Sequence, residues 1–285
     1  MIDWAVATKQ KVIQILPIND TTNTYTRKDS YPYNAISIYA LHPIYLGLKQ
    51  YPLKDENVYA SCMAEPTALN ALPQVGYEQV FRCKMAYIDT LFLERGADVL
   101  ASADFALFYG QNKDWLFPYA CFSYLRDRYK TADIRCWENF VVYDKQLLEN
   151  LLTSDLYVRL SIDKIYFIQY LLHTQLAEVK AYAHSRGVVL KGDIPIGINR
   201  NSVEAWTEPQ LFNMDTQTGD PPDDFSVNGQ NWGFPTYNWA EMSKDNYLWW
   251  VKRFRKMADY FAEHLLGESK MDEVDIVDIN REQTF

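Results

Sequence analysis

An acidic residue directly after a short apolar segment is the first candidate for chemistry. Asp193 follows residues 188–190 (VVL) almost immediately, and this apolar run predicts a buried parallel strand. The carboxyl ends of such strands are where barrels and open α/β folds place functional groups. Asp193 is therefore either a direct ligand of a polar substrate or a structural acid that orients the neighbouring loops.

A second group of polar and aromatic residues lies between residues 221 and 237. Asp223 and Asp224 follow two prolines, and the pair is equally typical of ligands and of a turn. Gln230 and Trp232 lie in a loop bracketed by glycines. Ordering such a loop costs backbone entropy, which argues against a plain linker. Trp232 is interpreted as a platform for a sugar ring, with a plug over the core as the alternative.

The loop after the first predicted strand offers a third group. Tyr33 and Asn34, together with Asp29 and Ser30, could bind hydroxyl groups, or the loop could simply be folded without a ligand. Long irregular loops in compact domains are usually functional or disordered. The aromatic and proline residues at 31–33 favour an ordered loop.

These residues require a scaffold of strands and helices. Residues 1–9 have the pattern of a helix end, and residues 11–18 (KVIQILPI) predict a buried strand. Residues 51–165 have mainly helical character. A helix then ends at Gly187, and a second strand covers residues 188–194. Two such strands separated by a large helical region predict an α/β architecture.

The C-terminal part predicts one more helix. Ser243 is its expected N-cap and Gly267 its expected end. The basic run 252–256 (KRFRK) is expected on the solvent-exposed face of this helix. An apolar stripe should pack on the scaffold; its members are Trp250, Phe254, Met257, Phe261 and Leu265.

Composition excludes several classes of partner. The net charge of −9 disfavours nucleic acid, whose binding needs clustered basic residues. Neither a membrane-length apolar run nor a signal peptide is present, so we expect no membrane and a cytoplasmic protein. No glycine-rich phosphate loop follows either strand.

Trp137 beside Glu138 is a weak ligand candidate, and His173 and His184 are expected to be ordinary helix residues. The four cysteines lack C-x-x-C spacing and the histidines lack ligand spacing, so no metal is indicated.

Seven segments, in order, resemble the 4-α-glucanotransferases (amylomaltase or disproportionating enzyme, glycoside hydrolase family 77). They are residues 14–18 (QILPI), 31–37 (YPYNAIS), 41–43 (LHP), 192–196 (GDIPI), 202–206 (SVEAW), 222–226 (PDDFS) and 229–237 (GQNWGFPTY). Residues 128–132 and 136–139 resemble the larger bacterial members. The resemblance runs from residue 1 to about 261, and the order of the motifs makes it specific.

The resemblance implies a fold and an activity. The fold is part of a (β/α)8 TIM-type barrel with a large, mainly helical insertion between barrel strands 2 and 3. The activity is retaining transfer of α-1,4-glucan segments, with maltodextrin, starch or glycogen as substrates and without a cofactor. The residues implied to line or support the glucan groove are Tyr33, Asp193, Asp223, Gln230, Trp232 and Pro235.

The sequence departs from the family pattern in its last part. The family's nucleophile belongs to an Arg-x-Asp-His pattern, which is absent here, and its other carboxylates belong to strands that would follow residue 285. Asp275 and Asp278 lack the Arg and His partners. We therefore expect a truncated portion without catalytic residues, inactive on maltotriose by itself, with the remainder of the barrel as a partner. The alternative is a non-catalytic glucan-binding or interaction protein derived from the family.

The resemblance also implies a domain organisation. Residues 1–50 should contain the end of barrel helix 1, strand 2 and the loop after it, and residues 51–160 the helical insertion. Residues 161–266 should contain a barrel helix, strand 3, the substrate loop and the next helix. Residues 267–285 should form a divergent acidic tail.

Overall fold

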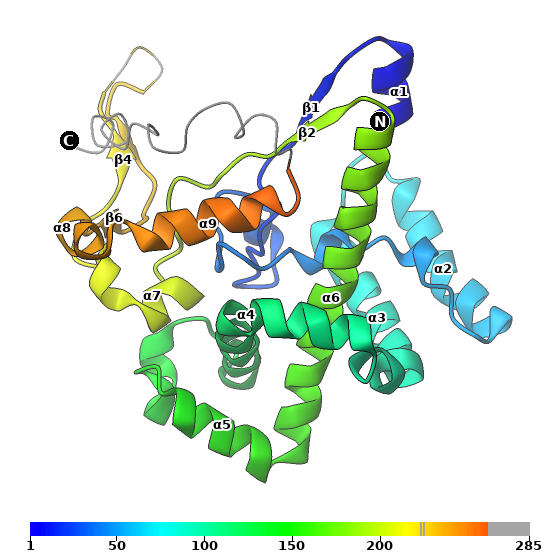
Figure 1. Cartoon of the computed structure of the whole chain (residues 1–285), viewed down its shortest axis with the longest axis horizontal. Coiled ribbons are helices and arrows are strands. Elements are labelled where there is room, and N and C mark those ends of the chain that lie inside the picture. The colour runs from blue at the N-terminus through cyan, green and yellow to red at the C-terminus, as the bar shows by residue number, and fades with distance from the viewer. Residues whose placement is uncertain (223, 225, 262–285) are drawn as a thin grey trace. The chain divides into compact units, whose positions relative to one another are not determined.

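Two short strands far apart in the sequence form a parallel pair. In the computed structural model, which describes residues 1–222, 224 and 226–261, β1 (Val12–Gln14) lies beside β2 (Val189–Lys191), with Ile13 opposite Leu190 (Figure 1). Both strands are therefore confirmed, at three residues each. The expected burial is wrong for β1, because Val12 is 48% exposed and β2 is the only strand beside it among the described residues.

The described chain divides into two compact units. Unit 1 contains Met1–Pro17, Tyr33–Ile38 and the described residues from Leu176 onward. Unit 2 contains Ile18–Pro32 and Tyr39–Gln175. The chain passes from unit 2 to unit 1 within the long helix α6 (Leu156–Ser185).

In unit 1, helices flank the parallel pair along the chain. The helix expected over residues 1–9 is confirmed as α1 (Ile2–Ala7). After α6, Gly187 takes φ +69°, a left-handed conformation that suits glycine, and the amide of Val188 bonds the carbonyl of Ala183 at 2.9 Å. The expected helix stop at Gly187 is thus confirmed, and it turns the chain into β2.

The rest of unit 1 is built from short elements between residues 203 and 258. They are α7 (Val203–Thr207), β3 (Phe212–Asn213), β4 (Gly219–Asp220), β5 (Gln230–Asn231), β6 (Thr236–Tyr237), α8 (Trp239–Met242) and α9 (Leu248–Ala258). β3 pairs with β6 and β4 with β5, both antiparallel. These two hairpin-like pairs fix the segment that contains residues 229–237.

The start of α9 differs from the expectation. Ser243 lies in a 3-10 turn (Ser243–Asp245) and is not the N-cap of the long helix. Asn246 and Tyr247 have left-handed backbone conformations, which interrupt the helix, and the Asp245 carboxylate accepts the amide of Leu248 at 3.1 Å. The expected end at Gly267 is wrong, because α9 ends at Ala258 and the next amides, of Asp259 and Tyr260, bond carbonyls three residues back. Gly267 itself and the contact of Leu265 lie outside the described residues.

An aromatic cluster forms the core around α9. The ring of Trp250 lies 5.1 Å from that of Tyr237, and Trp249 packs edge-on against Phe212. Arg253 is 1% exposed, and its guanidinium lies over both tryptophan rings, at 5.5 and 5.0 Å. The expectation that the whole basic run 252–256 faces solvent is therefore wrong for Arg253, since cation–π contacts hold it inside.

Unit 2 is helical, which confirms the character expected for residues 51–165. Its helices are α2 (Glu56–Asn70), α3 (Tyr77–Leu100), α4 (Ala103–Tyr129), α5 (Lys145–Ser154) and the first part of α6. Every residue from Leu116 to Arg126 is buried, so α4 supplies much of the core. No helix of the described residues is long and apolar enough to cross a membrane.

Candidate functional sites

The end of β2 meets the first loop of unit 1 through a pair of side chains. Tyr33 donates its hydroxyl to Oδ2 of Asp193 at 2.7 Å, and Oδ1 of Asp193 accepts the amide of Ile194 at 2.9 Å. Both Tyr33 and Asp193 are partly exposed. Asp193 is thus held in place by structural bonds while it stays within reach of solvent, which agrees with both interpretations of this acid.

The segment 33–38 is fixed to the stretch that leads into α7. Its carbonyls accept amide protons from residues 199 and 203, and its amide and hydroxyl groups bond the side chain of Glu204. The bonds are Asn199 N to Ala35 O (3.0 Å), Val203 N to Ile36 O (2.8 Å), Asn199 Nδ2 to Asn34 Oδ1 (3.0 Å), Ile38 N to Glu204 Oε1 (2.9 Å) and Ser37 Oγ to Glu204 Oε1 (3.3 Å). This attachment determines where Tyr33 lies.

Gln230 and Trp232 form a second pair. Gln230 belongs to β5 and is exposed; it accepts the indole N–H of Trp232 at 3.1 Å. The amide of Trp232 bonds the carbonyl of Thr218 at 3.0 Å, and the ring is partly exposed. Pro235 is buried, with its carbonyl near the hydroxyl of Thr218. Pro235 can thus support the loop from its buried side, whereas the exposed Gln230 and partly exposed Trp232 can contact a ligand.

The remaining predicted site residue, Asp223, lies outside the described residues. Among the predicted site residues that the structure describes, hydrogen bonds join Tyr33 to Asp193 and Gln230 to Trp232. Among the described residues, His, Cys, Asp and Glu side chains form no group of three or more that could hold a metal ion.

Glu204 is a buried acid that the sequence interpretation did not single out. It is 2% exposed, and burial raises its pKa to about 7, although the Ile38 amide, the positive charge of Arg253 and the Ser37 hydroxyl lower it. A sequence signal existed, because the acid stands among apolar residues in 202–206 (SVEAW). Glutamate is rarely buried without a partner, so the pattern alone favoured a position in solvent.

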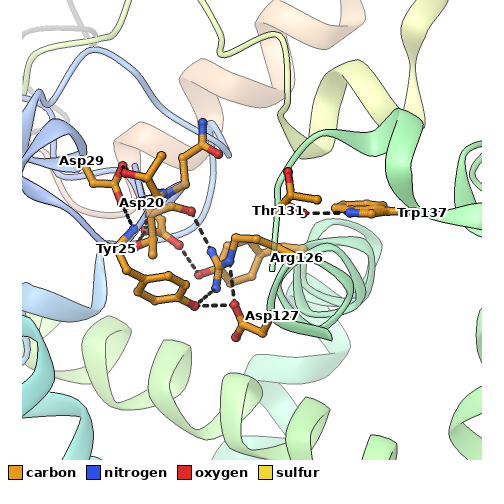
Figure 2. A network of polar contacts seen from close by, with 11 residues as sticks. Asp20, Tyr25, Asp29, Arg126, Asp127, Thr131 and Trp137 are labelled. Carbon is orange, nitrogen blue, oxygen red and sulfur yellow. Dashed lines mark hydrogen bonds and ion pairs between the residues drawn. The ribbon is translucent and has the colours of Figure 1, made fainter. Parts of the chain in front are cut away.

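Unit 2 contains a different polar cluster, centred on Arg126 of α4. The guanidinium donates to the carbonyl of Thr22 at 2.7 Å, to the hydroxyl of Tyr25 at 2.6 Å and to Asp127 at 2.8 Å (Figure 2). The Tyr25 hydroxyl also donates to Asp127, and burial raises the pKa of this phenol. No local sequence pattern indicates this network, because its members lie about a hundred residues apart in the chain.

Two buried acids hold the loop that carries Tyr25. Asp29 is 2% exposed, and its carboxylate accepts the amides of residues 23–25 at 2.6–3.1 Å. Asp20 accepts the hydroxyl of Tyr119 at 2.7 Å and the amide of Thr22 at 2.9 Å. Asp29 thus supports the alternative of a loop folded without a ligand.

The two residues of the weak candidate at 137–138 differ: Glu138 is exposed and accepts the hydroxyl of Tyr129 at 3.1 Å, whereas Trp137 is structural. Trp137 is fully buried, and its indole N–H donates to the carbonyl of Thr131 at 2.9 Å (Figure 2). Its ring packs edge-on against Phe122, with 4.9 Å between centroids. Trp137 therefore belongs to the core of unit 2.

A cavity of about 970 Å³ lies next to the Arg126 network within unit 2. Its lining includes Tyr25, Phe81, Tyr119, Arg126 and Lys164. The rings of Tyr25 and Phe81 pack edge-on at 5.4 Å. Its size lies in the range of small-molecule sites.

The comparisons with solved structures define the class of fold. The chain superimposes on an amylomaltase from Streptococcus agalactiae in complex with acarbose with a TM-score of 0.76 at 24% identity, over 91% of this chain and 52% of that one. It also superimposes on an amylomaltase from Corynebacterium glutamicum with a TM-score of 0.71 at 16% identity, over 91% and 36%. The fold is that of a part of the amylomaltases.

Comparison with protein families gives the same assignment from sequence. The family model Glyco_hydro_77, described as 4-alpha-glucanotransferase, matches residues 1–264. The chain belongs to this family, and the resemblance inferred from its motifs is confirmed.

Two relatives illustrate how much of the family the chain covers. It is 43% identical over 277 residues to the 4-alpha-glucanotransferase DPE2 of Oryza sativa subsp. japonica. The matched region covers 94% of this chain and 29% of that protein. It is 33% identical over 282 residues to a 4-alpha-glucanotransferase of Chlamydia caviae, and this match covers 94% of this chain and 50% of that protein. The chain thus spans half or less of the length of these relatives.

Proposed function

We propose that this chain is part of a 4-α-glucanotransferase that acts on α-1,4-glucans by retaining transglycosylation. The family membership supports this reaction, and the likeness to an amylomaltase whose structure holds acarbose supports a glucan as the ligand. The observation that carries the proposal is the Tyr33–Asp193 hydrogen bond of 2.7 Å, because it joins the loop after β1 to the carboxyl end of β2. Adjacent strand ends are the place where barrel enzymes bind substrates.

We propose that β1 and β2 are strands 2 and 3 of a (β/α)8 barrel. The parallel register and the long helical region between the two strands support this assignment. The helices of unit 2 would be the insertion between these strands, with domain limits near residues 50, 160 and 266. The exposed side chain of Val12 fits a strand that further strands of a barrel would cover.

The predicted site residues divide by role. Tyr33 and Asp193 form a polar pair that can bind sugar hydroxyls, and Trp232 offers a ring face, with Gln230 fixing its indole. Pro235 supports the loop from its buried position. Asp223 keeps its proposed ligand role from sequence alone. We propose that these residues form one wall of a glucan groove.

The chemistry of the reaction requires two carboxyl groups on either side of the scissile bond. We assign neither to this chain, so the 285-residue polypeptide by itself should bind glucan without transferring it. The reacting carboxylates would come from the part of the family's length that this chain does not span.

Calorimetric titration with maltoheptaose tests the binding proposal. Trp232→Ala removes the proposed stacking platform and should weaken binding about 10-fold, since aromatic contacts of this kind contribute roughly 1 kcal/mol or more. Trp4→Ala is the matched control, because Trp4 is 66% exposed on α1 and lies outside the proposed groove. Equal affinity of both variants would contradict the role of Trp232.

A further inference from the structure

A buried carboxylate attaches the segment that carries Tyr33. Oε1 of Glu204 accepts the amide of Ile38 at 2.9 Å and the hydroxyl of Ser37 at 3.3 Å. Both donors belong to segment 33–38, which also contains Tyr33. Glu204 is therefore connected to the Tyr33–Asp193 pair through one short, continuous stretch of chain.

The other oxygen of Glu204 is in an unusual position. Among the described residues, Oε2 is buried and has no hydrogen-bond partner. A buried carboxylate with one unsatisfied oxygen costs free energy in its charged form. For this reason burial raises the pKa of Glu204 to about 7, although hydrogen bonds from backbone amides and from the Ser37 hydroxyl lower it.

The charged and titratable groups facing Glu204 come from two further elements. Arg253 of α9 contributes a positive charge that lowers the pKa of Glu204. Tyr237 of β6 interacts with both Glu204 and Arg253, and burial raises the pKa of its phenol, so it stays neutral in the range where Glu204 titrates. Within this cluster, Glu204 is therefore the group whose pKa burial raises toward neutral pH.

We propose that Glu204 is a positioning residue of the glucan site. It holds segment 33–38 in the observed position, called closed here, and thereby keeps the hydroxyl of Tyr33 bonded to Asp193. The inference rests on the glucan-binding function proposed above. If Ser37 and Ile38 moved off the carboxyl, water would reach it and its pKa would return toward the ordinary value. The closed state then binds the extra proton, and closure weakens as pH rises through about 7.

Amide hydrogen exchange at Ile38 in the full chain tests the positioning directly. Protection factors, which remove the intrinsic pH dependence of exchange, should fall about 10-fold in the wild type from about pH 5.5 to about pH 8.5. Glu204→Gln keeps the acceptor oxygen without an ionisable group, so its profile should be flat. Equal slopes in the wild type and Glu204→Gln would overturn the proposal.

Glu208→Gln is the matched control. Glu208 directly follows α7, and burial raises its pKa as well, but its interactions are with Lys252 and Asp245. Neutralising it should leave the Ile38 profile as in the wild type. A flat profile in Glu208→Gln would show that general charge, rather than Glu204, controls the segment.

Glu204→Ala separates positioning from general stability. Loss of the acceptor should lower protection at Ile38 about 10-fold at every pH, while the amide of Trp206 in α7 keeps its protection. Equal losses at Ile38 and Trp206 would make Glu204 a plain stability residue and overturn the proposal. If Glu204→Ala does not fold, the comparison with Glu204→Gln decides alone.

Maltoheptaose titration distinguishes failure of the Glu204 role from failure of glucan binding itself. Wild-type affinity should fall about 10-fold over the same pH range, and that of Glu204→Gln should stay constant. If both proteins bind with the same pH dependence, the role of Glu204 fails and glucan binding stands. If neither binds while the exchange results hold, glucan binding fails and the control of segment 33–38 by Glu204 stands.

Discussion

Two acids in the loops of this protein look alike in sequence and behave differently in the structure. Asp29 in unit 2 is 2% exposed, and backbone amides of its own loop occupy its oxygens. Asp193 in unit 1 bonds one amide and the phenol of Tyr33, and it remains partly exposed. An acid whose hydrogen-bond donors come from its own loop stabilises that loop. An acid that bonds a distant side chain at a strand end, and stays partly exposed, can bind a ligand.

The same contrast separates the larger clusters. In unit 2, Arg126 and its partners fix the loop 19–30 against α4, and the polar atoms mainly satisfy one another. In unit 1, Gln230 and Trp232 keep exposed surface. The polar cluster of unit 2 should therefore respond to mutation in stability, and that of unit 1 in binding.

The largest expected effect is at Arg126. Arg126→Met leaves the buried carbonyl of Thr22 and the hydroxyl of Tyr25 without their donor, and should cost about 4 kcal/mol of unfolding free energy. Chemical denaturation measures this loss. Arg128→Met, two residues later and exposed, should cost less than about 0.5 kcal/mol. Similar costs for both substitutions would show that the network does not stabilise unit 2.

A pH effect of somewhat smaller size is expected from Glu204. Its folded pKa of about 7 lies above the ordinary 4.5, so the folded state binds more protons between these values. The stability that this group contributes is complete below about pH 4.5 and is lost as pH rises to about 7, by about 3 kcal/mol. Unfolding midpoints measured across this range should fall less in Glu204→Gln. If the wild type lost no more stability than Glu204→Gln over this pH range, the raised pKa of Glu204 would be contradicted.

The smallest expected effects are at Asp29 and Asp193. Asp29→Ala removes the acceptor of several amides and should cost about 2 kcal/mol of stability without changing affinity for maltoheptaose. Asp193→Ala should cost about 1 kcal/mol of stability and weaken binding about 10-fold. Parallel denaturation and calorimetry on both variants measure this. A reversed pattern would remove the distinction between a loop acid and a site acid.

Much of the scaffold could be predicted from local sequence. The apolar runs 11–18 and 188–190 predicted β1 and β2, and Gly187 predicted the helix end, because each signal is contained in a few adjacent residues. Ser243 was misleading, because the left-handed conformation of Tyr247 restarts the helix and Asp245 bonds its first turn. Strand length could not be predicted, since it depends on which neighbours pair with the strand.

The candidate site was predictable only in part. Asp193 and Tyr33 stand out because they follow strands, and Trp232 because it lies between glycines. Glu204, Arg253 and Arg126 are charged residues whose burial depends on partners far away in the chain. Local patterns place such residues in solvent, so their roles required the tertiary structure.

Hydrogen exchange of the full chain with and without maltoheptaose tests whether a glucan binds at the proposed groove wall of unit 1. We predict that the sugar slows exchange in residues 33–38, 192–196 and 229–237 of unit 1, where the proposed groove wall lies. Slower exchange confined to the loop 19–30 and α4 of unit 2, or no change anywhere, would contradict a glucan groove formed by Tyr33, Asp193 and Trp232.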